Sequence, residues 1–262
     1  MIIRSLFLLI CFTCGTSRLL LAETIPVLLD GDISVEDVPK KKTNWFGLYE
    51  HNGSYSLLPV KLTIEPYFNS IADAEEAQNI KSQWSGRTLK ATLLNAKIEN
   101  SEQLILVQSA SLKEGSIVTA FPGNDSSENR TVGDFSPLQS ISMSVGETHY
   151  RLEANSVPDN CEIKLHLDTA DTKNKIEDQA ITGKSAENNM HDWTKIPYLV
   201  AWCGAESPRL VWAGDMDRDG KVDLLLETPH DSTTSTGLFL SSLAEPGKLV
   251  KLVGLFTRPS GC

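Results

Sequence analysis

The chain has 262 residues, 40% of them hydrophobic, and its 34 acidic residues outnumber its 24 basic ones to give a formal charge of −10. This acidic balance, with no cluster of lysine or arginine, excludes the positive surface that binding to nucleic-acid phosphates requires. The length and hydrophobic content are sufficient for one large core or for two lobes.

The first 22 residues have the organisation of a secretory signal peptide, with an early positive charge at Arg4, a short apolar run and Ala22 at the expected cleavage position. The alternatives are an uncleaved membrane anchor, for which the apolar run is shorter than the roughly 20 residues needed, and a lipoprotein signal ending at Cys11 or Cys14. Plain cleavage is favoured. It predicts a secreted or periplasmic protein of residues 23–262, with a formal charge of −12 because two arginines and no acid are removed, and with no membrane span.

Three cysteines, Cys161, Cys203 and Cys262, remain after the predicted signal peptide, in a compartment where disulfides persist. An odd number predicts one bridge and one free thiol. The pair Cys203 and Cys262 is favoured because it would fasten the final residue to the body of the protein, although all three spacings allow a bridge. A tetrahedral zinc site is disfavoured, since no two of these cysteines are close and no histidine pair has ligand spacing.

Alternating apolar residues and turn signals predict β-strands along most of the chain. Two such runs flank residues 51–54, where Asn52 and Gly53 suit a tight hairpin turn. Pro59 then indicates an edge strand or an irregularity. Residues 70–84 form the one predicted helix, a short one with Ser70 as its N-cap.

Further strands are predicted in a meander, interrupted by the polar residues 169–195. The strand ranges are 89–94, 104–107, 117–120, 141–145, 150–152, 163–167, 196–202, 209–213, 222–227, 237–241 and 249–256. Residues 169–191 show no buried periodicity and therefore predict a long surface loop or a mobile insertion. The polar loop between the two possible lobes is placed at residues 169–195. The predicted fold is mostly β, with antiparallel, sandwich-like sheets, either as one unit or as two lobes, 23–168 and 196–262, joined by that loop.

The stretch DMDRDGKVD places four aspartates in nine residues around Gly220. Carboxylates this close repel one another by about 1 kcal/mol per near pair, even at a high effective dielectric, unless a cation lies among them. Alternate residues of a tightly curled loop point inward, which leaves Met216 and Arg218 in solvent, and Gly220 permits the sharp turn. Oxygen ligands in flexible number favour calcium over magnesium. The predicted ligands are the carboxylates of Asp215, Asp217, Asp219 and Asp223 and the peptide carbonyl of Lys221.

The loop departs from an EF-hand, because Leu226 stands where that motif needs a bidentate glutamate. Pro208 and Pro229 also disfavour flanking helices. A strand, loop, strand arrangement fits better, since it turns residues 222, 224 and 226 to one face of a strand and residues 223, 225 and 227 to the other.

The same nine residues match the pattern Asp-x-Asp-x-Asp-Gly-x-x-Asp at every defined position, and they resemble the calcium loops of FG-GAP and integrin-type (VCBS-like) β-propeller repeats. The resemblance covers residues 212–227 in a single copy, so it implies an ion and not a propeller. A looser likeness to uncharacterised exported bacterial proteins that carry this loop rests on residues 210–227, residues 237–250 and the terminal Gly261-Cys262. It implies a periplasmic or extracellular β protein without naming an activity.

Other interpretations of the polar residues are weaker. A solvated acidic turn would need one or two aspartates rather than four. The neighbours His191-Asp192 and His230-Asp231 do not form a hydrolase triad, because sequence neighbours rarely adopt that geometry and no nucleophile motif is present. Asp215 or Asp223 with Glu227 would be a poor glycosidase pair, because carboxylates committed to a metal are poor proton donors.

Among the tryptophans, Trp202 and Trp212 suit core packing, whereas Trp193 lies in a polar stretch and is the best candidate for stacking on a sugar. The sequence therefore predicts an exported, non-enzymatic β protein with a structural calcium ion and a binding or structural role. It leaves open whether the partner is a protein or a glycan. The alternative is a carbohydrate-binding module, or a glycoside or ester hydrolase, stabilised by calcium.

Overall fold

The structure is a computed structural model that describes much of the chain after residue 26. The described residues are 27–28, 31–34, 44–66, 88–93, 102–109, 111–121, 140–157, 160–168, 178–183, 199–200, 208–230 and 233–259. Every regular element in these ranges is a β-strand, which confirms the prediction of a mostly β fold. The helix predicted for residues 70–84 lies outside them. No helix in the described part is long and apolar enough to cross a membrane.

The N-terminal sheet has five antiparallel strands in the order β1-β7-β3-β4-β8. They are β1 (Val27–Leu28), β3 (Trp45–His51), β4 (Ser54–Val60), β7 (Glu102–Gln108) and β8 (Gly115–Ser116). β3 and β4 form the predicted hairpin, in which Asn52 and Gly53 have positive φ angles of 50° and 75°. Pro59 lies beyond the two residues of β4 that pair with β8, a position where a strand tolerates proline.

A second, smaller antiparallel sheet continues from β4 through β5 (Leu62–Pro66). Its order is β2-β6-β5, with β2 spanning Gly31–Ser34 and β6 spanning Thr88–Leu93. β6 confirms the strand predicted near residues 89–94.

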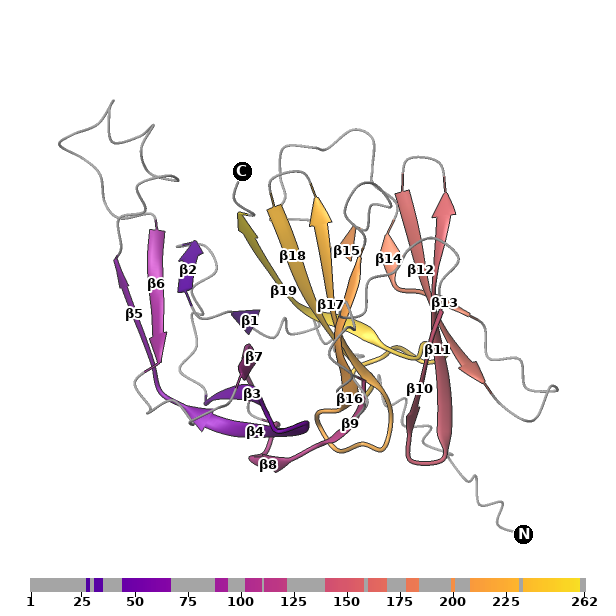
Figure 1. The fold of residues 1–262 in the computed structure, drawn as a ribbon, viewed down its shortest axis with the longest axis horizontal. Helices are drawn as coiled ribbons and strands as arrows, with labels where there is room; N and C mark the ends of the chain where they lie inside the picture. The colour runs from indigo at the N-terminus through magenta and orange to yellow at the C-terminus, as the bar shows by residue number, and fades with distance from the viewer. Residues whose placement is uncertain are drawn as a thin grey trace, which may run out of the picture.

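The central sheet carries the loop of interest and has the order β19-β18-β17-β16-β9, all antiparallel (Figure 1). Its strands are β9 (Val118–Phe121), β16 (Arg209–Asp215), β17 (Asp223–His230), β18 (Thr233–Leu240) and β19 (Lys251–Pro259). β9 belongs to the first of the two suggested lobes and the other four strands to the second. The two ranges therefore share one sheet.

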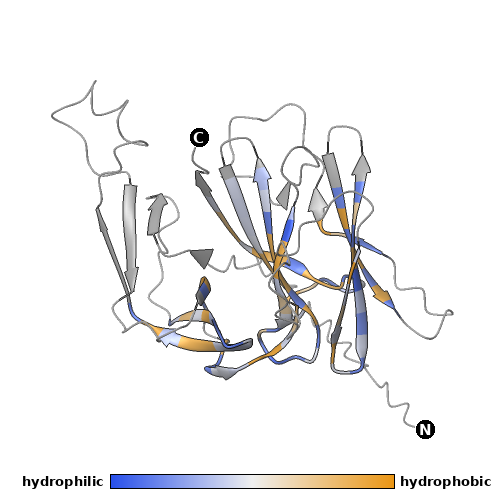
Figure 2. Ribbon diagram, viewed as in Figure 1, coloured by the Kyte–Doolittle hydropathy of each residue, from blue (hydrophilic) through white to orange (hydrophobic). Residues whose placement is uncertain are grey.

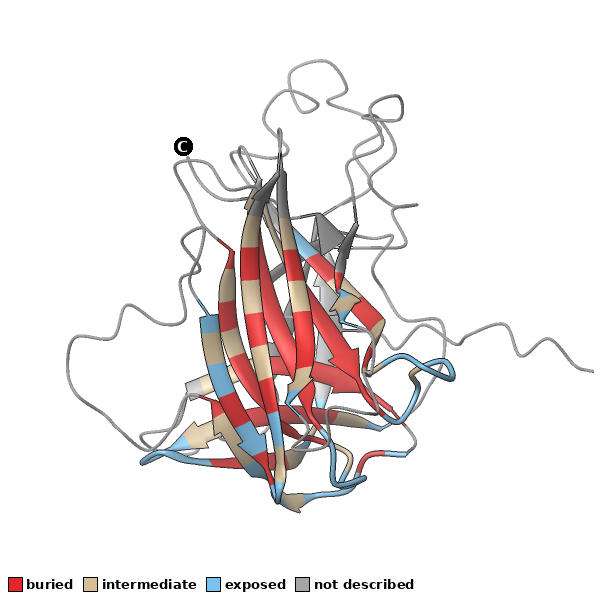
Figure 3. Cartoon of the chain, turned by 90° about the vertical axis from the view of Figure 1, so that its right-hand side faces the viewer, coloured by how far each residue is buried: buried red, intermediate tan, exposed pale blue. Residues whose placement is uncertain are grey.

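A four-stranded sheet, here called the meander sheet, packs against the face of the central sheet that is opposite the N-terminal sheet (Figure 1). It contains β10 (Ser140–Val145), β11 (Thr148–Val157), β12 (Asn160–Asp168) and β13 (Gln179–Ala180) in chain order, all antiparallel. Buried residues alternate with less buried ones along its strands (Figure 3), and Tyr150 and Leu152 face the core on one side, as predicted.

The predicted surface loop 169–195 is interrupted by ordered structure. β13 pairs with β12, Ile181 is buried, and β14 (Thr182–Gly183) pairs in parallel with β15 (Leu199–Val200). The Gln179 side chain explains why so polar a segment docks. Its amide oxygen accepts hydrogen bonds from the backbone N–H groups of Leu249 and Val250, at 2.6 and 3.0 Å, and its amide nitrogen donates to the Val250 carbonyl at 2.7 Å. The Gln179 side chain thus makes the backbone hydrogen bonds that a neighbouring strand would otherwise make with residues 249 and 250.

Two hydrophobic cores lie on the two faces of the central sheet, and apolar strand segments line both (Figure 2). Core I is shared with the N-terminal sheet and includes Leu48, Leu57, Ile105, Trp212, Leu225 and Leu238. Core II is shared with the meander sheet and includes Tyr150, Leu152, Ile163, Leu224, Leu226 and Phe239. The central sheet is thus the middle layer of three.

Burial on both faces explains the unbroken apolar runs of β17 and β18. Leu225 faces core I, while Leu224 and Leu226 face core II, which confirms the predicted division of this strand between two faces. A strand with one solvated face would alternate apolar and polar residues, but both faces of β17 are covered, and its buried acidic side chains, Asp223 and Glu227, have polar partners.

Leu225→Ala tests the importance of core I. Leu225 is fully buried, so removing its side chain leaves a cavity, and we expect the free energy of unfolding to fall by about 2–5 kcal/mol. Leu243→Ala is the control, because Leu243 is 46% exposed and its truncation should change stability by less than about 0.5 kcal/mol. Urea denaturation of both variants measures the difference, and similar losses would contradict the layered arrangement.

Candidate metal centre

The aspartate loop connects β16 to β17 at one end of the central sheet. Asp215 is the last residue of β16 and Asp223 is the first of β17, and the pairing of Gly214 with Asp223 holds the two strand ends side by side. β9 flanks β16 on its other edge, where Asp215 pairs with Val118. The sheet therefore fixes the backbone positions of the first and last aspartates.

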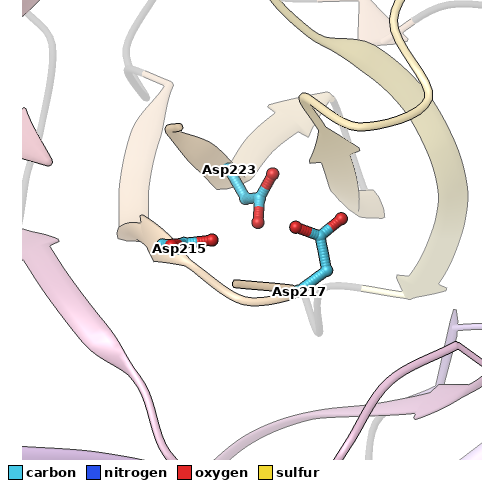
Figure 4. Close-up of side chains that lie close together, drawn as sticks. All are labelled: Asp215, Asp217 and Asp223. Atoms are coloured by element: carbon cyan, nitrogen blue, oxygen red, sulfur yellow. The ribbon is translucent and has the colours of Figure 1, made fainter. Parts of the chain in front are cut away.

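Three carboxylates converge within this loop (Figure 4). One oxygen from each of Asp215, Asp217 and Asp223 lies within 4.8 Å of the other two. Asp215 is 6% exposed and Asp223 is fully buried, whereas Asp217 is partly exposed. The structure thus brings together three of the four carboxylates that the sequence predicts as ligands.

The remaining two predicted ligands lie beside this group. The Asp219 carboxylate accepts hydrogen bonds from the Ser241 hydroxyl, at 3.0 and 3.1 Å to its two oxygens, and from the Lys221 N–H at 2.9 Å. The Lys221 residue is exposed. Asp219 is therefore engaged with hydrogen-bond donors rather than with the other three carboxylates.

Backbone N–H groups hold the two buried carboxylates in place. Asp215 accepts from the N–H groups of Asp219 and Gly220 at 2.9 and 3.0 Å. Asp223 accepts from the Met216 N–H at 2.7 Å, and its other oxygen accepts from the Ser241 N–H and hydroxyl at 2.8 and 3.0 Å. These bonds orient both side chains without the help of an ion, because hydrogen bonds to a charged acceptor are short and strong.

The carboxylate of Asp217 accepts fewer hydrogen bonds than those of Asp215 and Asp223. One of its oxygens accepts a hydrogen bond from the Ser242 hydroxyl. The other, Oδ1, is buried and has no hydrogen-bond partner among the described residues. A buried carboxylate oxygen without a partner is destabilising, and the effect grows when the neighbouring groups are also negative. A cation between the three carboxylates would satisfy this oxygen and remove their repulsion.

Burial and mutual repulsion both act on the ionisation of the cluster. Burial, reinforced by the negative charge of Asp217, raises the pKa of Asp223 to about 7, against the lowering effect of hydrogen bonds from Ser241 and Met216. Burial also raises the pKa of Asp217, and its hydrogen bond from Ser242 opposes that rise. Without a cation, the group therefore holds on to protons at pH values where ordinary aspartates are ionised.

The prediction that Met216 lies in solvent is wrong. Met216 is fully buried in core I, next to two carboxylates in the chain. Its backbone N–H donates to Asp223 while its side chain packs in core I, and burying an apolar side chain of this size contributes about 1.5–3 kcal/mol. Arg218 is exposed as predicted, and Gly220 has the positive φ, 82°, expected at the sharp turn.

Sequence reasoning missed the two serines and the tyrosine around the loop. Ser241 and Ser242 follow β18, and continuing the register that pairs Leu224 with Phe239 brings Ser241 opposite Val222. That pairing was the only signal that could have placed them here. Tyr150 of the meander sheet lies close enough that the charges of Asp219, Asp223 and Asp215 help burial to raise its pKa.

The other predicted sites are not assembled in the described part of the chain. Cys203, Cys262, Trp193 and His191 lie outside it, and Cys161 is described only through its backbone in β12, where it pairs with Ser156. The disulfide and the sugar-stacking tryptophan stay predictions.

The glycosidase pair does not form at this end of the sheet. Glu227 forms an ion pair with Arg209 on the neighbouring strand. The backbones of Glu227 and Asp223 are four residues, roughly 13 Å, apart along β17. Glu227 is therefore engaged with Arg209 and is not a member of the group formed by Asp215, Asp217 and Asp223.

The stability of the protein in a chelator should fall as the pH rises. The pKa of Asp223 is about 7 in the folded state and about 3.9 in an unfolded chain, so its contribution to stability is fully present below pH 4 or so and is lost as the pH rises through about 7. Urea unfolding at several pH values between roughly 5 and 8 measures the fall. Asp217→Asn should make the fall shallower, because the Asp217 charge is one cause of the raised pKa. A flat profile would contradict the assignment.

Asp217→Asn should stabilise the metal-free protein above neutral pH. The change removes one charge from the cluster, and each near pair of carboxylates repels by about 1 kcal/mol. The change removes little favourable bonding, because no residue in the described part of the chain bonds to Oδ1 and the Ser242 hydroxyl can bond either group. Asp215→Asn is the matched control, and it should destabilise, since both of its oxygens accept backbone N–H bonds that an amide nitrogen cannot accept. Chemical denaturation in a chelator separates the two variants.

Comparison of the chain with protein-family models, with curated proteins and with solved structures finds no match.

Proposed function

We propose that this chain is an exported β protein that binds one calcium ion in the loop 215–223, and that the ion stabilises the fold rather than acting as a signal. The observation that carries the proposal is the buried Oδ1 of Asp217, which has no hydrogen-bond partner among the described residues and belongs to a side chain directed toward those of Asp215 and Asp223. Three convergent carboxylates of this kind call for a positive charge.

The identity of the ion follows from the ligand atoms. The converging groups offer only carboxylate oxygens, which suit calcium and magnesium and disfavour the softer metals that prefer sulfur or imidazole. Calcium accepts 6–8 oxygens in flexible geometry, whereas magnesium requires a near-ideal octahedron. In the proposed complex, Asp219 exchanges its Ser241 hydrogen bonds for the ion, and the Lys221 carbonyl completes the protein ligands. The likeness to FG-GAP calcium loops supports this ligand set.

A structural role suits the surroundings of the loop. Asp215 and Asp223 lie on strand ends that border both hydrophobic cores, and Met216 anchors the intervening backbone in core I. The described residues contain no pair of helices whose angle an ion could change. Export, proposed from the first 22 residues, would place the site where calcium is abundant, and extracellular sites commonly bind at about 10⁻⁴–10⁻³ M.

Calcium titration followed by calorimetry tests the proposal. We expect one site, with a melting temperature that rises with calcium: at a hundredfold excess over Kd, the ion contributes about 2.7 kcal/mol, or roughly 5–11 °C for a chain of this size. Magnesium should bind more weakly. Asp217→Asn should weaken calcium binding by about tenfold or more, equivalent to at least ~1.4 kcal/mol, although the variant itself is stable. No heat of binding at millimolar calcium would overturn the proposal.

A further inference from the structure

One side chain of the acidic loop reaches out of it to a distant part of the chain. Arg218, between Asp217 and Asp219, donates hydrogen bonds from Nη2 to the backbone carbonyls of Glu114 and Ser116, at 3.0 and 3.3 Å. A Cβ atom built on Gly115 would lie 3.2 Å from the same nitrogen, so the guanidinium rests directly against this backbone.

The segment to which Arg218 donates these hydrogen bonds connects the N-terminal sheet to the central sheet. β8 belongs to the N-terminal sheet, where Ser56 and Leu57 are its partners, and β9 begins two residues later in the central sheet. Between them, the Ile117 N–H donates to the Tyr55 carbonyl at 3.1 Å. Figure 1 shows β8 and β9 beside the loop that follows β16. We call residues 114–118 the crossover segment.

The Arg218 backbone depends on the conformation of the acidic loop. Its φ angle is +64°, a left-handed conformation that a residue with a Cβ adopts at some cost. The neighbouring hydrogen bonds from Asp219 and Gly220 to Asp215 hold the loop in this curve. Repulsion among the carboxylates acts against it, and a cation would cancel that repulsion.

We propose that Arg218 is a positioning residue that fastens the crossover segment to the ion-bound loop, so that calcium occupancy controls how firmly the N-terminal and central sheets are joined. This inference rests on the calcium site proposed above. Arg218 bonds to backbone carbonyls, so the strength of this contact depends on the position of the Arg218 side chain and not on the side chains of the crossover segment. Opening of the segment is then coupled to release of the ion.

Hydrogen exchange measured by mass spectrometry tests the coupling in the full chain, with and without calcium. If opening of the crossover segment releases the ion, calcium slows its exchange by the factor 1 + [L]/Kd, which is about elevenfold at free calcium ten times Kd. We expect this slowing in peptides that cover both residues 111–121 and the loop 215–223. The Ile117 amide is a natural reporter, because it is hydrogen-bonded to Tyr55.

Arg218→Ala tests the contact between Arg218 and the crossover segment separately from calcium binding. We call this contact the latch. The variant keeps all the carboxylates, so calcium should still bind, as calorimetry would show, and should still slow exchange in the loop, but the slowing in residues 111–121 should be lost. Lys113→Ala is the matched control: it removes an exposed positive charge next to the crossover segment, and the slowing should persist.

The outcomes distinguish the two proposals. Slowing of residues 111–121 that survives Arg218→Ala would overturn the latch, since the pairing of β9 with β16 would then hold the segment unaided. Slowing confined to the loop of the unmodified protein would also overturn it and leave the calcium site standing. Absence of calcium binding to the unmodified protein would remove the calcium site and the latch with it.

Discussion

The repulsion among Asp215, Asp217 and Asp223 is the constraint on which the rest of the site depends. Two of these carboxylates lie on strand ends that the central sheet fixes, so they cannot move apart without breaking strand pairing. Backbone N–H groups and two serine hydroxyls offset part of the cost of burying them. The negative charge that these hydrogen bonds do not compensate lies in a region of low dielectric. Protonation of a carboxylate or binding of a cation would neutralise it.

The position of the loop gives this local conflict a wider effect. The central sheet is covered on both faces, and its β16–β17 connection touches core I through Met216, the β18–β19 connection through Ser241, and the crossover segment through Arg218. Segments that are far apart in the sequence therefore meet at nine residues. A charge placed there acts on how the layers hold together, and not only on the loop itself.

The sequence predicted those features of the structure that depend on residues close together in the chain. The Asn52-Gly53 turn, the strands and the division of β17 between two faces depend on neighbouring residues, and so do the aspartates that converge. It failed where distant contacts decide: Met216 is buried because core I lies beneath it, and Gln179 orders a polar segment through bonds to Val250. Neither the contact of Ser241 with the loop nor the contact of Arg218 with residues 114–116 could be predicted without the three-dimensional arrangement of the strands. Neither the order of the sheets nor the presence of two cores could be read from a single chain.

The hydroxyl of Ser241 gives the site a rigid half and an adaptable half. This hydroxyl lies within 3.1 Å of both oxygens of Asp219 and within 3.0 Å of Asp223, yet it has one hydrogen to donate. Asp223 keeps its two backbone N–H bonds whichever way that hydrogen points, so its carboxylate stays fixed. Asp219 competes for this hydrogen and is otherwise bonded to the Lys221 N–H of its own loop, so its carboxylate is less firmly fixed than that of Asp223. A site with one firmly held carboxylate and one less firmly held carboxylate would be able to adjust to the size of a bound ion.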